Sequence, residues 1–284
     1  MARESRLARL TVVVQGGGRV VEGSMQLEAD RMRIELKELV LDRPVGPATA
    51  RFTGTSEGDE EFVGFLDDDI AFDMGSLSDL VDRCEAGQFG GASGVLATAD
   101  TSLLHRRVKT MLFRSIFKDL RPSSVHARRP VSSDILSGGM TVYRRALYDR
   151  SASTSFHFPP DACGEDIELS FSASRCARLV LDPSVRVRNR TRGLSMGPIG
   201  TTNRALWRLD LYRDFAARHA TSRRHWLAYG LVLIGVTIRG VGEGARWTFI
   251  RSALLEGARV ARTLARPTLP HAASGHAAAT PGRG

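Results

Sequence analysis

Apolar residues recur along the chain in short runs that alternate with stretches of helical spacing. The runs at 10–14 and 62–66 are short and rich in β-branched or aromatic residues, which is typical of buried strands. Residues 76–85 instead carry apolar side chains at helical spacing. This alternation of strands and helices predicts an α/β fold built in layers around a sheet.

The remaining elements are predicted in the same way. Further strands are expected at 33–41, 94–98, 140–143 and 179–182. Helices are expected after Pro47 and over 101–120, 164–176 and 245–265. A further short helix is expected after the strand at 140–143, and it continues to residue 150. Residues 121–134 are rich in proline, serine and arginine, which predicts a loop.

Three aspartates, Asp67, Asp68 and Asp69, follow directly after the strand predicted at 62–66. Adjacent carboxylates at a strand end repel one another unless a cation lies among them. Along an extended chain Asp67 and Asp69 point to the same side, so their oxygens can converge on Mg²⁺ or Mn²⁺. A solvated acidic turn explains the same residues, and the triplet alone does not decide between these two interpretations.

A second acidic group opens the helix predicted at 164–176, where Glu165, Asp166 and Glu168 occupy the first turn. Acidic residues at a helix N-terminus stabilise the helix dipole in any protein. In a functional site, Asp166 would instead serve as a general base that accepts a proton from an attacking hydroxyl. Both interpretations stay open on this segment alone.

Together these segments resemble the family-2 glycosyltransferases of the GT-A fold, over roughly residues 10–266. The resemblance depends on five segments: 46–51, 65–69 as the D-x-D motif, 138–145 with its glycine pair, 164–166 as the E-D motif, and 211–213. It implies a GT-A-like α/β/α sandwich with a mixed, mainly parallel sheet, followed by C-terminal amphipathic helices. It also implies an inverting, metal-dependent transfer of a sugar from a nucleotide-sugar to a hydroxyl.

The resemblance assigns roles to particular residues. Asp166 would deprotonate the acceptor as the catalytic base, and Glu165 would support its position. The implied donor-binding residues are Asp67, Asp68, Arg51, Gly138 and Gly139. The implied ligands of Mg²⁺ or Mn²⁺ are Asp67 and Asp69.

Some features depart from the family pattern. Family members begin with a strand and a Pro-x-Tyr-Asn-like turn that residues 1–9 do not offer, so we expect the first strand–helix unit to be absent. The family's Arg-Asn pair is Arg51-Phe52 here, and its late histidine corresponds to Asn189. A catalytically inactive glycosyltransferase-like binding protein is therefore one alternative. A metal-dependent nucleotidyltransferase is another, although the chain has no P-loop.

The charged residues are distributed unevenly and divide the chain into regions. The 284 residues include 40 basic and 31 acidic side chains, a net charge of +9. Residues 1–202 are balanced, with 27 of each sign, whereas 203–266 carry 12 arginines against 4 acids. We therefore expect a catalytic domain at 1–202, a basic helical segment at 203–266 and a disordered tail at 267–284.

The basic segment has an amphipathic pattern. On the helix predicted at 245–265 and its end, arginines 251, 259, 262 and 266 fall within about 80° of arc beside an apolar arc that includes Trp247 and Leu254. A basic stripe beside an apolar stripe is typical of a helix that lies in an anionic membrane surface. Packing on the catalytic domain and insertion into the membrane are the alternatives. No nucleic-acid-binding module is recognised, so no nucleic-acid partner is expected.

The cysteines and apolar runs indicate the compartment. Cys84, Cys163 and Cys176 are widely spaced and match neither a disulfide framework nor a zinc site. The longest apolar run, 226–238, is shorter than the ~18 residues of a spanning helix. We therefore expect a reducing compartment. Together with the basic segment at 203–266, this predicts a cytoplasmic protein that is peripheral at the inner face of the plasma membrane. Membrane contact would suit a glycosyltransferase that acts on a glycan or lipid-linked acceptor of the cell envelope.

Overall fold

The computed structural model describes residues 7–15, 23–42, 45–67, 70–73, 75–96, 121, 126–155, 165–189 and 198–266. The chain divides into two compact units, Met1–Leu194 and Ser195–Gly284. The domain boundary predicted after residue 202 lies inside helix α8 (Pro198–His219). That prediction follows the excess of arginine, which begins within the helix and not at its first residue. The helix predicted over 101–120 and the tail at 267–284 lie outside the described residues.

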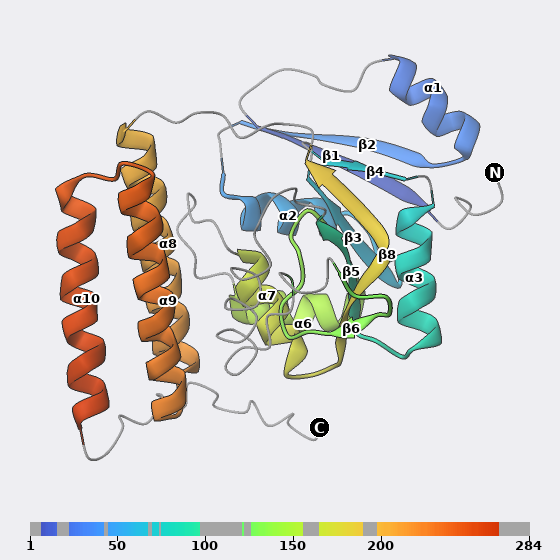
Figure 1. Cartoon of the computed structure of the whole chain (residues 1–284). Coiled ribbons are helices and arrows are strands. Elements are labelled where there is room, and N and C mark those ends of the chain that lie inside the picture. Colours follow the sequence, from blue (N-terminus) through green and yellow to red (C-terminus); the bar gives the residue numbers. More distant parts are fainter. Residues whose placement is uncertain are drawn as a thin grey trace, which may run out of the picture. The chain divides into compact units, whose positions relative to one another are not determined.

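A six-stranded mixed sheet forms the centre of the first unit (Figure 1). Its strands, in spatial order, are β3 (Phe62–Leu66), β7 (Met140–Arg144), β5 (Gly91–Leu96), β8 (Leu179–Asn189) and β4 (Ile70–Phe72), with the short β6 (Val131–Ser132) also paired to β8. β3, β5 and β8 run in the same direction, and β7 runs against them. The predicted α/β class is confirmed, and the parallel arrangement holds for these main strands but not for β7, β4 and β6.

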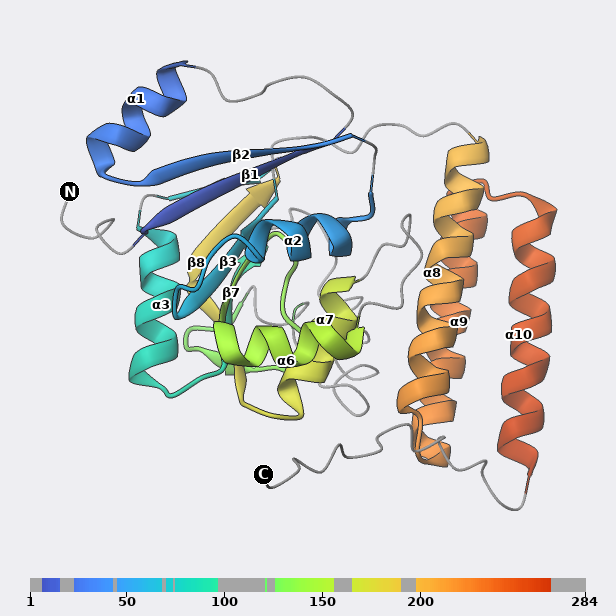
Figure 2. The same ribbon diagram turned by 180° about the vertical axis from the view of Figure 1, so that it is seen from behind.

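Helices cover both faces of this sheet (Figures 1 and 2). On one face lies α3 (Ser76–Ala86), whose Leu80 belongs to the same buried cluster as Val142 of β7. On the other face lie α6 (Arg145–Ser155) and α7 (Glu165–Ser174), whose Tyr148 and Leu169 pack in a cluster with Phe65 of β3. Successive side chains of each strand point to opposite faces of the sheet, so they pack alternately into one cluster and the other. The expected α/β/α sandwich is therefore confirmed.

A two-stranded parallel sheet precedes the central one along the chain. It consists of β1 (Arg9–Gln15) and β2 (Glu35–Leu41), with α1 (Gly23–Met32) between them in sequence and α2 (Pro47–Thr55) after them. α2 packs against β1 so closely that a Cβ on Gly54 would lie 3.1 Å from Cγ2 of Val13. Within the described residues β1 pairs only with β2.

Two strands of the central sheet extend beyond their predicted limits. β5 begins at Gly91, earlier than expected, and its first residues are all buried. These residues are small and have low strand propensity, so the sequence pattern does not indicate that they belong to a strand. β8 continues past Pro183, which normally ends a central strand. The register with β5 shifts between Gly94 and Val95, so residues 183–185 bulge out of the ladder and the proline is accommodated.

The second unit is a bundle of α8, α9 (Arg223–Gly242) and α10 (Trp247–Ala265). Short connections make successive helices antiparallel neighbours. Leu209, Trp226, Leu233 and Phe249 lie in their shared core. The expected C-terminal helices are therefore confirmed, and the first of them, α8, contains the segment 211–213 and begins before residue 203.

A buried carboxylate joins α3 to β8. The Asp182 side chain is 2% exposed, and its Oδ2 accepts a hydrogen bond from Nε of Arg83 at 2.6 Å. Its Oδ1 accepts from the backbone N–H of Ser184 at 3.0 Å and from the Ser184 hydroxyl at 2.6 Å. Burial alone would raise the pKa of Asp182, but these hydrogen bonds and the charge of Arg83 outweigh it and lower the pKa.

We predict that Asp182→Asn lowers the free energy of unfolding at neutral pH by about 2 kcal/mol, because the Arg83 and Ser184 donors lose a charged acceptor. The folded pKa lies below the ordinary value of 3.8, so the wild-type advantage is present above that pH and is lost as the pH falls through the folded pKa. Urea unfolding at a series of pH values should show the two proteins converging in acid. Equal stabilities at neutral pH would contradict the prediction.

Candidate functional site

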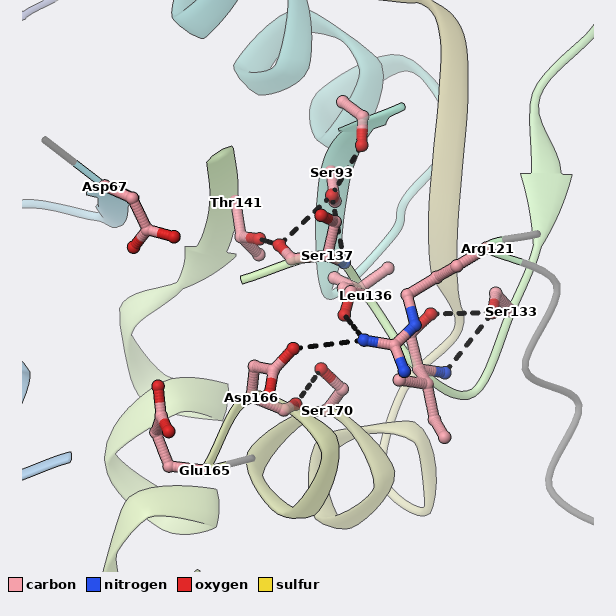
Figure 3. A network of polar contacts seen from close by, with 12 residues as sticks. Asp67, Ser93, Arg121, Ser133, Leu136, Ser137, Thr141, Glu165, Asp166 and Ser170 are labelled. Atoms are coloured by element: carbon pink, nitrogen blue, oxygen red, sulfur yellow. Dashed lines mark hydrogen bonds and ion pairs between the residues drawn. The ribbon is translucent and has the colours of Figure 1, made fainter. Parts of the chain in front are cut away.

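Two acids that are 99 residues apart in the sequence lie beside the same glycine pair, at one edge of the central sheet. Asp67 directly follows β3, and Asp166 lies in the first turn of α7 (Figure 3). β7 starts where its antiparallel neighbour β3 ends, with Leu66 opposite Met140. As a result, the segment before β7 reaches the end of β3, and the backbone N–H of Asp67 donates to the Gly139 carbonyl at 3.0 Å.

The glycine pair before β7 passes close to both acids. A Cβ on Gly138 would lie 3.2 Å from Cβ of Asp166 and 3.3 Å from its Oδ2. A Cβ on Gly139 would lie 3.5 Å from Cγ2 of Ile70 and 3.7 Å from Oδ2 of Asp67. The backbone at Gly138 and Gly139, predicted to bind the donor, therefore passes close to the two acids.

Arg51 of α2 links the two acidic motifs directly. Its Nη2 donates to Oδ1 of Asp67 at 3.0 Å, and its Nη1 donates to Oε1 of Glu165. Its guanidinium also lies 5.6 Å from the ring centroid of Phe65. Burial alone would lower the pKa of Arg51, but the carboxylates of Glu165 and Asp67 outweigh it and raise the pKa. Arg51 is therefore a permanent positive charge between the motifs.

A second arginine, Arg121, contacts Asp166 itself. Its Nη1 donates to Oδ2 of Asp166 at 3.1 Å and lies 3.4 Å from the Leu136 carbonyl oxygen (Figure 3). Sequence reasoning missed Arg121 because it opens the stretch predicted as a loop, where arginine is common and no pattern distinguishes one from another. Only the folded chain shows that this arginine faces the candidate base.

Buried hydroxyls anchor the start of α7 to the sheet. The Ser170 hydroxyl donates to the Asp166 carbonyl, and the Tyr143 hydroxyl of β7 lies 3.0 Å from Oγ of Ser170. Burial raises the pKa of Tyr143, so this phenol stays protonated. The Ser137 N–H, just before the glycine pair, donates to Oγ of Ser93 in β5 at 3.2 Å. Regular elements therefore hold the acids in place, as precise sites require.

The structure brings together these predicted site residues: Arg51, Asp67, Gly138, Gly139, Glu165 and Asp166. Asp68 and Asp69 lie outside the described residues. Two side chains differ in access, because that of Asp67 is 42% exposed whereas that of Glu165 is 12% exposed. Asp67 can thus face a ligand, and Glu165 faces Arg51.

The side chains at this edge of the sheet include possible ligands for the predicted Mg²⁺ or Mn²⁺. Within the described part of the chain, no group of three or more histidine, cysteine or acidic side chains is placed to hold a metal ion. Asp67 nevertheless offers a solvent-accessible carboxylate whose Oδ2 faces the side-chain-free backbone of Gly139. Hard oxygen ligands of this kind fit Mg²⁺ or Mn²⁺, with Asp69 as the predicted second carboxylate.

Residues 26–151 match the family model of Glycosyl transferase family 2. The matched stretch contains Arg51, Asp67 and the glycine pair, and it ends before Glu165 and Asp166. The match therefore covers the part of the site that contains Asp67 and leaves out the part that contains Asp166. A search of curated proteins gives no match.

Three solved structures are similar to this chain at low sequence identity. The mannosyltransferase PcManGT from Pyrobaculum calidifontis, in complex with GDP-Man and Mn²⁺, is 16% identical, with 91% of this chain and 72% of that one covered and a TM-score of 0.48. S. aureus TarS 1–349, in complex with UDP-GlcNAc, is 15% identical, with 93% and 84% covered and a TM-score of 0.46. GalNAc-T7 with UDP, GalNAc and Mn²⁺ is 13% identical with a TM-score of 0.46, and 67% of this chain matches 40% of that longer one. These similarities say nothing about what this chain binds.

We predict that Arg51 and Glu165 are energetically coupled, because both side chains are largely buried and each compensates the charge of the other. Arg51→Gln and Glu165→Gln should each destabilise the fold, and the double variant should be more stable than the sum of the two effects implies. The coupling energy should be about 0.5–3 kcal/mol from chemical unfolding of all four proteins. Additive effects would mean that the two residues do not interact in solution.

We also predict that the two glycines respond differently to alanine. Gly138→Ala should destabilise the protein by about 1–3 kcal/mol, because the new methyl group overlaps the Asp166 side chain. Gly139→Ala is the matched control, since its methyl group meets only ordinary van der Waals contacts. Unfolding in urea measures both, and equal losses would show that the Gly138 backbone does not pack on Asp166 as described.

Proposed function

We propose that the chain transfers a sugar from a nucleotide-sugar to an acceptor hydroxyl with inversion at the anomeric carbon, in keeping with the match of residues 26–151 to the model of Glycosyl transferase family 2. The observation that supports this most is the convergence of Asp67 and Asp166 at one edge of the sheet. An inverting transfer needs one group near the donor diphosphate and another that deprotonates the acceptor on the opposite face of the sugar. Two acids that are held on separate elements can supply both functions.

Asp166 is the base of this proposed reaction. Its carboxylate takes the proton of the acceptor hydroxyl while the acceptor oxygen forms a bond to the anomeric carbon. The bond from that carbon to the diphosphate oxygen breaks, and its electron pair leaves with the nucleoside diphosphate. Arg121, which donates to Oδ2 of Asp166, keeps the carboxylate in one orientation. The Ser170 hydroxyl bonded to the Asp166 carbonyl restrains the backbone beneath it.

Arg51, Asp67 and Glu165 form the donor side of the site. Asp67, with Asp68 and Asp69 after it, would face the donor. Asp67 and Asp69 would hold Mg²⁺ or Mn²⁺, which when bound neutralises the charge that develops on the departing diphosphate. Both Nη atoms of Arg51 already bind carboxylates, so we assign it a positioning role beside its expected contribution to donor binding. Glu165 acts through Arg51 and fixes the start of α7.

The acceptor is proposed to be a cell-envelope glycan or a lipid-linked precursor. The chain would work in the cytoplasm, peripheral to the inner face of the plasma membrane. The support for this location is regional charge, since the residues before 203 are neutral overall and 203–266 carry the excess of arginine.

We predict that Asp166→Asn lowers the rate of sugar transfer by about 10²–10⁴-fold, because the amide cannot accept the acceptor proton. Donor binding should be retained, since this carboxylate faces the acceptor. The measurement is release of nucleoside diphosphate from a panel of nucleotide-sugars with Mn²⁺ or Mg²⁺, with and without acceptor lipids. Donor affinity is measured separately by calorimetry.

Asp67→Asn is the contrasting variant, and it should weaken metal-dependent donor binding. Loss of donor binding in Asp166→Asn would reject its assignment as the base. If the wild type released nucleoside diphosphate from no donor, the chain would instead be a glycosyltransferase-like binding protein. Release of pyrophosphate from nucleoside triphosphates would identify a nucleotidyltransferase.

A further inference from the structure

The solvent side of α9 carries an apolar stripe that no described residue covers. Four large apolar side chains of this helix are at least half exposed: Leu227, Ile234, Ile238 and Val241. At 100° per residue they fall within about 60° of arc, so they form one line along the helix. The opposite side of α9 is buried in the bundle, where Trp226, Tyr229 and Leu233 belong to its core.

The neighbouring helix α10 exposes a mixed apolar and basic side. Its Trp247, Leu254 and Leu255 are each more than three-fifths exposed. Arg251 and Arg262 lie in the same exposed arc, between these apolar residues on the helix wheel. Long arginine side chains in such positions can extend their charge past the apolar surface beside them.

The acids of this unit are paired with arginines other than Arg251 and Arg262, including Arg259, which lies 3.4 Å from Oε1 of Glu256. Arg213 pairs with Asp210 at 2.8 Å and with Asp214 at 3.1 Å. Glu243 pairs with Arg208 and Arg239, at 3.1 Å and 2.6 Å. Glu256 is buried and accepts a hydrogen bond from the Tyr229 hydroxyl at 3.0 Å. The outward sides of α9 and α10 therefore present apolar surface with net positive charge.

We propose that these outward sides of α9 and α10 form a docking surface for an anionic lipid bilayer, hereafter the interfacial face. Its residues are Leu227, Ile234, Ile238, Val241, Trp247, Arg251, Leu254, Leu255 and Arg262. Apolar side chains enter the acyl boundary while the arginines bind lipid phosphates. Charge complementarity selects this occupant, because a second copy of the chain would bring one cationic surface against another. The inference deepens the membrane part of the proposed function but needs no catalysis for its test.

The interfacial face lies on the membrane and does not cross it. Among the described helices, α9 is long and apolar enough by length and composition to span a bilayer, but 39% of its apolar window is buried in the protein. Spanning would strip Trp226 and Leu233 from their partners in α8 and α10 and break the Tyr229–Glu256 hydrogen bond. Lying flat keeps the bundle intact and buries only the exposed stripe.

The test is sedimentation of the full chain with phosphatidylcholine vesicles that contain or lack phosphatidylglycerol. The wild type should bind the anionic vesicles and stay in solution with the neutral ones. Ile234→Gln with Ile238→Gln should lower the partition coefficient about tenfold or more, because two large apolar side chains no longer enter the lipid. Arg251→Gln with Arg262→Gln should lower it about 30-fold on anionic vesicles.

Matched controls are available on the first unit. Met25→Gln with Leu27→Gln removes two exposed apolar side chains of α1, and Arg31→Gln with Arg175→Gln removes two exposed charges. Both controls should bind vesicles like the wild type, and all variants should keep the wild-type melting temperature. Release of nucleoside diphosphate from donor alone, without vesicles, should be the same in Ile234→Gln/Ile238→Gln and the wild type, which separates this inference from the proposed function.

Four results would overturn the proposal. One is a wild type that stays in the supernatant with both kinds of vesicle. Another is wild-type binding by the variants of the interfacial face, or an equal loss of binding in the controls of the first unit. The last is a wild-type dimer in light scattering that the Ile234→Gln/Ile238→Gln variant converts to a monomer, without vesicle binding by either protein, because the face would then bind a second copy.

Discussion

The site depends on one largely buried positive charge, the guanidinium of Arg51. Asp67 and Glu165 come from distant parts of the chain, and without a cation between them their carboxylates would repel each other. Arg51 lies on α2, which packs against β1 through the contact of Gly54 with Val13. The small N-terminal sheet therefore contributes to the site although it supplies none of the reacting groups, because it holds the helix that carries this charge.

Much of the fold could be predicted because local signals agree with the final packing. β3 has the expected limits, since its short apolar run ends at an acidic run, and α2 begins at the expected Pro47. β5 and β8 could not be delimited. The small residues of β5 acquire their strand character only from neighbours on both sides, and β8 tolerates Pro183 only because a bulge removes it from the ladder.

The roles of the site residues stay predictions, but some of these residues could be singled out from the sequence. Asp67, Asp166 and the glycine pair were identified through the order and spacing of motifs that resemble family-2 glycosyltransferases. Arg121 was not, because arginine serves several purposes in this chain. Arg83 neutralises a buried acid, Arg51 bridges two motifs, and Arg251 faces solvent on α10. A guanidinium can donate in several directions at once, so its partners are decided by the tertiary fold and not by its neighbours in sequence.

The antiparallel pairing of β7 with β3 determines how far apart Asp67 and Gly139 lie. The spacing of Asp67 and Gly139 follows from hydrogen bonds between β3 and β7, with Leu66 opposite Met140. It does not follow from the number of residues that separate the two strands. The length of the connection between β5 and β7 therefore does not set the spacing of Asp67 and Gly139. A shift of one residue within β7 would instead turn each of its side chains to the other face and move the glycine pair away from both acids.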